Sequence, residues 1–189
     1  MKLRFLRLTL GVSLTLACCL VQSGGSSAAS PAAKASNLGT CRLGRLSVTV
    51  AGGSAAAGTE GMLIAFRNTG PAACHLQGYP KVVATRPGAS STAISSLITG
   101  LGGLAPNATP PPISLKQGAS ASVVVAAGDE PQAVTSPCVH QRYKMVKVSL
   151  LGQAGAKTLT AELPKQATSL PSCSPVEVTP FQKGVTWGL

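Results

Sequence analysis

Aromatic and acidic residues are scarce in this chain of 189 residues. Aromatics make up 3% of it, and 5 Asp and Glu stand against 16 Lys and Arg. With so few aromatic side chains, a hydrophobic core must be built from Val, Leu, Ile and Ala. Catalysis by paired carboxylates needs two groups facing one cleft, and the sequence suggests no such pair. Asp129 and Glu130 are adjacent, but Gly128 and Pro131 flank them and predict a solvated turn.

Motifs of common catalytic and metal sites are also missing. The sequence contains no G-x-S-x-G, no P-loop, no G-x-G-x-x-G, no C-x-x-C and no H-x-x-x-H. We therefore predict a protein that is not an enzyme and holds no cofactor. Two alternatives stay open. One is a copper or zinc site formed by His75, His140 and Met145, because imidazole and thioether ligands suit copper. The other is a hydrolase with a serine nucleophile.

No apolar run is long enough to predict a membrane-spanning helix. Residues 8–21 form an apolar stretch of 14 residues behind Lys2, Arg4 and Arg7, which is typical of a signal peptide. We expect the signal peptide to cover residues 1–28 and a flexible linker of small residues and proline to cover residues 29–40. The protein is then exported, and it is either secreted or lipid-anchored at the outer face of the cell membrane.

Two processing schemes stay open for this segment. Residues 26–28 and 33–35 offer small side chains to an ordinary signal peptidase. Alternatively, residues 15–18 (Thr-Leu-Ala-Cys) resemble a bacterial lipobox, in which the thiol of Cys18 would carry a diacylglycerol and tether the protein to the membrane. Cys19 is a weaker candidate because Cys18 precedes it.

The remaining four cysteines predict a disulfide framework. Cys41, Cys74, Cys138 and Cys173 are widely spaced, and an even number of such cysteines in an exported chain favours disulfides over a metal site. We favour the pairs Cys41–Cys74 and Cys138–Cys173, because each closes a loop of similar length. The other two connectivities stay open.

Short alternating runs predict an all-β sandwich over residues 41–189, with seven to nine strands. In residues 45–50, Leu46, Val48 and Val50 alternate with polar residues, whereas residues 62–67 are apolar on both faces and predict a central strand. Further strands are expected at 81–86, 119–127, 143–151, 159–163 and 176–181.

Finer expectations concern three of these segments. In 119–127, Ala121, Val123 and Val125 are expected to point inward, and Ser120 and Ser122 outward. The apolar phase changes within 143–151, which predicts a β-bulge. Residues 87–112 are rich in Gly and Pro and predict a loop.

Residues 66–80 carry the most specific local pattern. Residues 68–71 (Asn-Thr-Gly-Pro) predict a turn with positive φ at Gly70, after which Cys74 anchors a new strand to an earlier segment. Tyr79 stands at a second corner, where its ring can be buried.

These residues resemble a family of uncharacterised exported bacterial domains. The matching positions are Cys41, Phe66-x-Asn68-Thr69-Gly70, Cys74-x-Leu76-x-Gly78-Tyr79-Pro80, Gly118, Cys138 and Cys173. Such domains are common in actinobacteria, often as lipoproteins, and form a domain of unknown function. The resemblance covers about residues 41 to 178. It implies a disulfide-linked immunoglobulin-like sandwich and no particular activity.

The excess of basic residues predicts an anionic partner. From Asn37 onward the chain has 12 basic and 5 acidic residues, and a basic exported domain attracts anionic envelope polymers, anionic lipid headgroups or nucleic acid. The charges are spread singly, so solvated strand faces are the alternative interpretation. Arg142, Lys144 and Lys147, around Tyr143, form a basic cluster that we expect to contact a protein or an anionic envelope polymer, rather than a specific nucleic acid. A basic strand edge that prevents strand addition is the alternative explanation. We expect a monomer.

Overall fold

A computed structural model describes residues 38–56, 58–95, 110–128, 142–163 and 168–187. These residues form β-strands and a single turn of 3-10 helix, η1 (Leu43–Arg45). None of the helical structure in these ranges is long and apolar enough to cross a membrane. The predicted signal peptide, Cys18, Cys138 and His140 lie outside the described residues.

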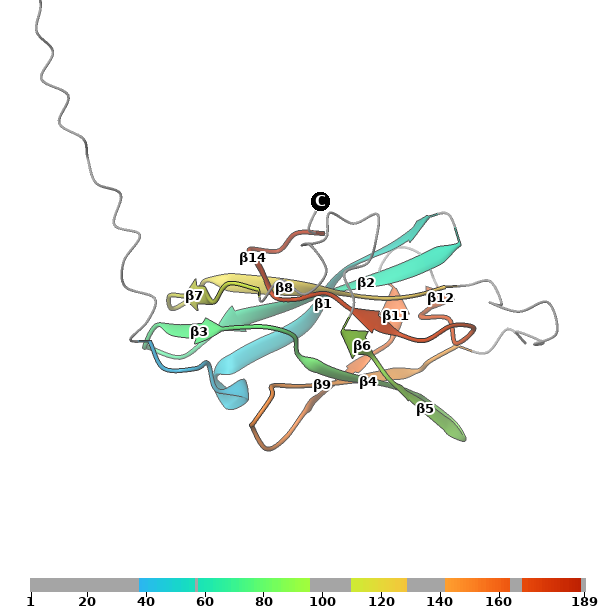
Figure 1. The fold of residues 1–189 in the computed structure, drawn as a ribbon, viewed down its shortest axis with the longest axis horizontal. Coiled ribbons are helices and arrows are strands. Elements are labelled where there is room, and N and C mark those ends of the chain that lie inside the picture. The colour runs from blue at the N-terminus through green and yellow to red at the C-terminus, as the bar shows by residue number, and fades with distance from the viewer. Residues whose placement is uncertain (1–37, 57, 96–109, 129–141, 164–167, 188–189) are drawn as a thin grey trace, which may run out of the picture. The chain divides into compact units, whose positions relative to one another are not determined.

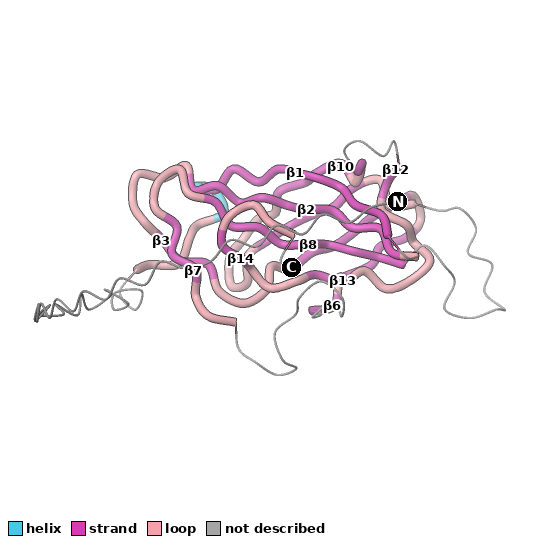
Figure 2. Tube along the Cα trace, turned by 90° about the horizontal axis from the view of Figure 1, so that it is seen from above, coloured by secondary structure: helices cyan, strands magenta, loops and turns pink. Residues whose placement is uncertain are grey.

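The larger sheet has six strands. Its order is β1-β2-β8-β13-β6, and β14 also pairs with β8. Every pair is antiparallel except β13 with β6. Figure 2 shows β1, β2, β8 and β13 following one another across this sheet. The bounds are β1 Leu46–Ala56, β2 Thr59–Asn68, β6 Ile94–Ser95, β8 Ser120–Gly128, β13 Glu177–Val178 and β14 Gln182–Lys183.

The second sheet has four strands in the order β10-β9-β4-β5. Two further pairs, β3 with β7 and β11 with β12, complete the strands of the described part. Figure 1 shows β4, β5 and β9 in one layer and β1, β2 and β8 in another. The bounds are β3 Cys74–Leu76, β4 Lys81–Arg86, β5 Ala89–Thr92, β7 Ile113–Leu115, β9 Met145–Ser149, β10 Lys157–Thr160, β11 Glu162–Leu163 and β12 Thr168–Ser169.

Small and branched apolar side chains fill the space between the two sheets. The larger sheet contributes alternate residues of β2 and β8, and the smaller sheet contributes alternate residues of β4 and β9. Phe66 and Phe181 add two aromatic rings to this core, with ring centroids 5.1 Å apart in an edge-to-face arrangement. The predicted all-β, immunoglobulin-like sandwich is confirmed. The described residues form 14 strands rather than seven to nine, and seven of these strands have only two or three residues.

Strand β2 is covered on both faces, as its apolar composition predicts. Its outer face belongs to a second, smaller cluster formed by Leu63, Val124, Ala126 and Trp187. Ser122 lies on this outer face, as expected, but the cover leaves it fully buried rather than exposed. Its hydroxyl donates to the carbonyl oxygen of Thr186 at 3.0 Å and accepts from the Thr186 N–H at 3.1 Å. The segment after β14 therefore packs over a face that alternation alone assigns to solvent.

Three local expectations are wrong. Residues 89–95, expected in a loop, form β5 and β6. The chain passes from one sheet to the other at Ala93. The Ala93 N–H donates to the Val82 carbonyl oxygen, and the Ile94 N–H donates to the Val176 carbonyl oxygen. The register of β9 runs without a shift, and the irregularity lies in β1 between Val50 and Gly52. Residues 159–163 are divided at Ala161 because β10 pairs with β9 while β11 pairs with β12.

The turn after β2 forms by a different means than expected. Gly70 does not have positive φ, whereas Gly78 does (φ 71°). The turn is held instead by buried Asn68, whose Oδ1 accepts from the Gly70 N–H at 2.9 Å. Its Nδ2 donates to Ala72 (2.9 Å) and to Leu115 (3.0 Å), so one side chain joins β2, the turn and β7.

The Cys41–Cys74 disulfide is confirmed, with Cα atoms 4.8 Å apart. Cys173 is also disulfide-bonded, but Cys138 lies outside the described residues, so that pairing stays a prediction. The domain begins earlier than Cys41: Thr40 forms a bridge with His75, and the His75 N–H donates to Gly39 at 3.0 Å. The end of the expected linker is therefore part of the fold.

Candidate functional site

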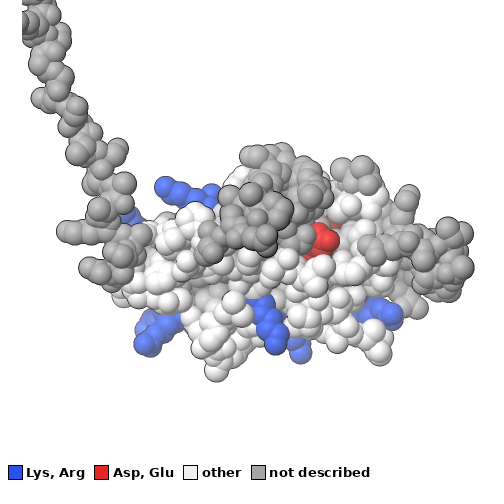
Figure 3. Space-filling model, viewed as in Figure 1, with Lys and Arg blue, Asp and Glu red and all other residues white. Residues whose placement is uncertain are grey.

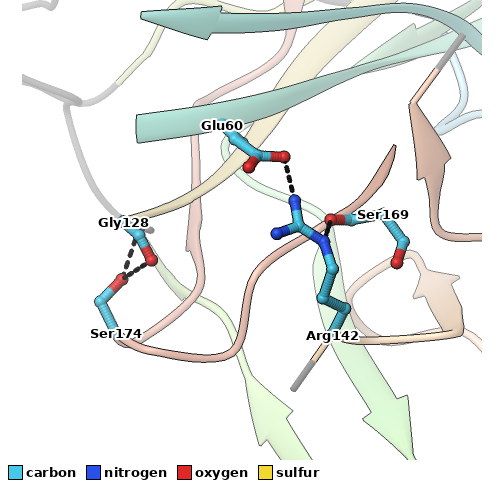
Figure 4. A network of polar contacts seen from close by, with 5 residues as sticks. All are labelled: Glu60, Gly128, Arg142, Ser169 and Ser174. Carbon is cyan, nitrogen blue, oxygen red and sulfur yellow. Dashed lines mark hydrogen bonds and ion pairs between the residues drawn. The ribbon is translucent and has the colours of Figure 1, made fainter. Parts of the chain in front are cut away.

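Arg142, expected to contact an anionic partner, is engaged within the protein. Its Nη2 forms an ion pair with Glu60 Oε2, and its Nε donates to the Ser169 carbonyl oxygen. Figure 4 shows the guanidinium between Glu60 of β2 and Ser169 of β12. The side chain of Arg142 is 28% exposed and that of Glu60 is 11% exposed. Arg142 therefore connects the larger sheet to the β11–β12 pair, a role that the sequence does not reveal.

A polar contact of the same kind lies close by. Ser174 Oγ accepts from the Gly128 N–H at 2.6 Å and donates to the Gly128 carbonyl oxygen at 3.4 Å, as Figure 4 also shows. This contact fixes the end of β8 against the segment that leads into β13. Both contacts join chain segments that are far apart in sequence, and we assign both to stability.

We expect Glu60→Gln to lower the free energy of unfolding by about 1 kcal/mol, because it leaves a half-buried guanidinium without its ionic partner. Urea denaturation would measure the change. A double-mutant cycle with Arg142→Gln should give a coupling energy of similar size. Lys144→Gln, two residues from Arg142 and exposed, is the matched control and should change stability by less than about 0.5 kcal/mol. Equal effects of Glu60→Gln and Lys144→Gln would contradict the assignment.

The other two predicted contact residues, Lys144 and Lys147, are exposed. Lys147 is in β9, which lies between β10 and β4, so it does not protect a sheet edge. Val146 and Val148 point into the core, so Lys147 projects from the outer face of the four-stranded sheet. Lys144 precedes β9, and its N–H donates to Thr85. The structure therefore separates Lys147 from Arg142, which sequence proximity had grouped together.

Lys81, which the sequence did not single out, joins Lys147 on the outer face. In the register of β4 with β9, Lys81 faces Ser149, and Val83 faces Lys147. Lys81 and Lys147 are thus diagonal neighbours on one face, a relation that places Cα atoms about 7–8 Å apart. Only strand register could reveal this pair, because 66 positions separate the two residues in the chain (147 minus 81).

His75, proposed as a metal ligand, is bound by the first residues of the domain. Its Nδ1 lies 2.6 Å from the Leu38 carbonyl oxygen, which can only accept, so Nδ1 carries the proton. Its Nε2 lies 3.4 Å from Thr40 Oγ1. No group of three His, Cys, Asp or Glu that could hold a metal occurs among the residues that the structure describes. His140 lies outside them, so a site with His75, His140 and Met145 stays a prediction.

The contacts of His75 can also be compared with those that a hydrolase needs. A nucleophilic hydroxyl is activated by an imidazole that a third group orients, often a carboxylate. At His75 the neighbouring hydroxyl is that of Thr40 at 3.4 Å, and the orienting group is the Leu38 backbone carbonyl. This arrangement holds the incoming chain against β3.

The packing position of the single tryptophan was not predicted from the sequence. Trp187 packs on Leu63, Val124 and Ala126. Its ring lies over Gly52 and Gly61, where an added Cβ would come within 3.4 Å of ring carbons. Glycine inside a strand often marks close approach by another group. Gly52 and Gly61 therefore offered the available signal in the sequence.

Taken together, these features define a disulfide-linked β-sandwich domain whose exposed charge is mainly basic. The chain belongs to the family described as domain of unknown function DUF4232, whose family model matches residues 41–182. The resemblance drawn from the sequence is thereby confirmed. No curated protein and no solved structure matches the chain.

Proposed function

We propose that this protein is an exported, non-enzymatic module of the cell envelope that binds an anionic envelope polymer. The proposal rests mainly on one observation, the outer face of the four-stranded sheet, where Lys81 and Lys147 are diagonal neighbours. The polymer that fits is a polysaccharide with repeated phosphate or carboxylate groups, because both ammonium groups act as point charges on one flat face.

Hydroxyl groups surround the two lysines. Lys147 faces Thr158 on β10, Met145 faces Thr160, and Lys81 faces Ser149 on β9. Thr158 and Thr160 are exposed, and Ser149 is half-buried. Hydroxyl groups both donate and accept hydrogen bonds, as sugar hydroxyls do. The face therefore combines positive charge with groups suited to a carbohydrate.

Carboxylates of the described residues do not compete for these lysines. Glu60 and Glu177 belong to strands of the larger sheet, and Glu162 belongs to the β11–β12 pair. Lys144 is also exposed, at the start of β9, and adds positive charge near the face. Attraction to a polyanion is thus not offset by acidic groups on the four-stranded sheet.

Co-sedimentation of the full chain with a purified phosphate-bearing wall polysaccharide tests this function. We expect the double variant Lys81→Gln/Lys147→Gln to bind about tenfold more weakly, since each exposed charge contact contributes roughly 0.2–1 kcal/mol. Its affinity should also depend less on salt than that of the unmodified chain.

The matched control removes two other exposed lysines, by Lys116→Gln/Lys183→Gln. This variant has the same net charge as the first, and its affinity should remain close to that of the unmodified chain. Equal losses in the two variants would show that net charge alone attracts the polymer. Salt-independent binding would also contradict the proposal.

A further inference from the structure

Basic residues from distant parts of the sequence meet at one end of the sandwich. Arg67 of β2 pairs with Ser120, the first residue of β8, and Lys183 of β14 pairs with Ala121. Lys116 lies in the turn just before β8, where its carbonyl oxygen accepts from Ala119. Arg67, Lys116 and Lys183 are all exposed, so three segments of the chain place their cations around the start of one strand.

The short helix η1 adds two more cations to this end. The Arg45 carbonyl oxygen accepts from the Thr69 N–H at 2.9 Å, directly after β2 ends at Asn68. Arg42 immediately precedes η1, and the Arg45 N–H donates to its carbonyl oxygen. We use the name basic end for the five exposed cations and two exposed apolar residues of this region: Arg42, Arg45, Arg67, Lys116, Lys183, Leu151 and Val185. Figure 1 shows η1, β3 and β7 together at the left.

Two large apolar side chains are exposed among these cations. Leu151 is 70% exposed, and it follows β9 in a turn that Gln153 fixes against η1 through bonds to Leu43 (2.9 Å) and Cys41 (2.7 Å). Val185 is 51% exposed and follows Gly184, whose N–H donates to Ser120. The described part exposes three large hydrophobic side chains, and these are two of them.

The described carboxylates lie at the opposite end of the larger sheet. Glu60 pairs with Ala127 and Glu177 pairs with Ala126. Six residues of β8 separate these positions from Ser120 and Ala121, a distance of about 20 Å along a strand. Glu162 pairs with Ser169, which contacts Arg142 next to Glu60. In Figure 3 the visible acidic atoms lie near the middle of the view, and basic side chains project at the left end and along the lower edge.

The chain also enters the domain at the basic end. Gly39 and Thr40 pair with His75 of β3, and β3 pairs with β7, which Lys116 follows. Only residues 22–37 separate this entry from the apolar stretch 8–21. Sixteen residues span at most about 55 Å, so a membrane that holds residues 8–21 or a lipid on Cys18 stays within reach.

We propose that the basic end rests on the anionic lipid headgroups of a membrane. Cations attract such headgroups, and exposed apolar side chains among them enter the boundary between headgroups and acyl chains. Leu151 and Val185 are suited to that second role. This inference concerns a different surface from the polymer-binding face, and it does not depend on it.

Lysine footprinting of the full chain tests the proposal. The chain is mixed with vesicles of phosphatidylcholine alone, or of equal parts phosphatidylcholine and phosphatidylglycerol, and is labelled with a membrane-impermeant amine reagent. Mass spectrometry then gives the labelling rate of each lysine. With anionic vesicles we expect the rates at Lys116 and Lys183 to fall about fivefold or more, and high salt should restore them. The rate at Lys147, which is exposed on the outer face of β9, should stay unchanged.

Two variants with the same loss of charge sharpen the test. Arg42→Gln/Arg45→Gln/Arg67→Gln removes three cations of the basic end but keeps Lys116 and Lys183 as reporters, and it should abolish their protection. Lys81→Gln/Lys147→Gln/Lys157→Gln removes three cations from the four-stranded sheet and should leave that protection intact.

Three outcomes would overturn the proposal. The first is equal labelling of Lys116 and Lys183 with neutral and anionic vesicles, which the unmodified chain reports whether or not the variants fold. The second is protection that survives the loss of all three arginines. The third is protection by a soluble anionic polysaccharide as strong as that by vesicles, which would assign the basic end to a polymer. Loss of polymer binding by Lys81→Gln/Lys147→Gln would still be measured separately, so the two proposals can fail independently.

Discussion

Replacing Cys41 and Cys74 together by alanine is expected to lower the free energy of unfolding by about 4 kcal/mol. The disulfide joins residues 33 positions apart, and a cross-link of that length restricts the unfolded chain by an amount that corresponds to about 3–4 kcal/mol. It also holds the fully buried Cys41, next to η1, against β3. Equilibrium denaturation in guanidinium chloride without reductant would measure the change.

The matched control for this prediction is Thr49→Ala. Thr49 is exposed in β1, and the substitution should change stability by less than about 0.5 kcal/mol. A decrease below about 1 kcal/mol in the double cysteine variant would contradict the stabilising role of this disulfide. Because the variant retains Cys173, the comparison isolates the Cys41–Cys74 cross-link.

Asn68→Ala is expected to lower the free energy of unfolding by about 3 kcal/mol. The side chain is 1% exposed and makes three hydrogen bonds, to Gly70, Ala72 and Leu115. Alanine would leave backbone groups without their partner, at a cost of about 1–3 kcal/mol for each group that stays buried. Thermal unfolding followed by circular dichroism would measure the loss.

Thr69→Ala provides the comparison within the same turn. The Thr69 hydroxyl also donates to a backbone carbonyl, that of Arg45 at 2.9 Å, but this bond is exposed. Water can replace it, so we expect a loss of less than about 1 kcal/mol. If the two variants lose equal stability, burial does not determine the contribution of Asn68.

The two proposed surfaces give the domain a consistent orientation. The proposed lipid contact would turn the basic end toward a membrane, and the outer face of the four-stranded sheet would then remain available to a polymer. Both surfaces rely on exposed cations, which salt screens. The polymer assay and the lipid footprint use different reporters, namely Lys81 with Lys147 and Lys116 with Lys183, so each surface can be examined while the other is intact.

Local patterns predicted the strands that pack by regular alternation. The alternating residues that begin at Leu46 lie in β1, and the apolar run at 62–67 lies in β2, which is covered on both faces. The strand predicted at 81–86 is β4, with the same bounds. The pairing of Cys41 with Cys74 was also predicted correctly. In these segments the structure follows directly from the side-chain period and the spacing of the cysteines, so a single sequence is enough to predict it.

Contacts between distant segments explain the failures. Ser122 has the alternation of an exposed residue, yet the segment up to Trp187 covers it. Arg142 belongs to a basic run in the sequence, yet it pairs with Glu60, 82 positions away. Alternation along a strand does not show whether a later segment packs on its outer face. A run of basic residues does not show which of them forms an ion pair.

The sequence by itself determined the class of fold, the strands of the central core, one disulfide and the excess of positive charge. Only the tertiary structure decided where that charge lies: β2 and β14 pair with the start of β8 and so bring Arg67 and Lys183 near Lys116, which precedes β8. The physical reason is that hydrophobic alternation acts over a few neighbouring residues, whereas strand order and register join residues from the whole chain. A surface that is built from residues of several strands therefore cannot be recognised in any one segment of the sequence.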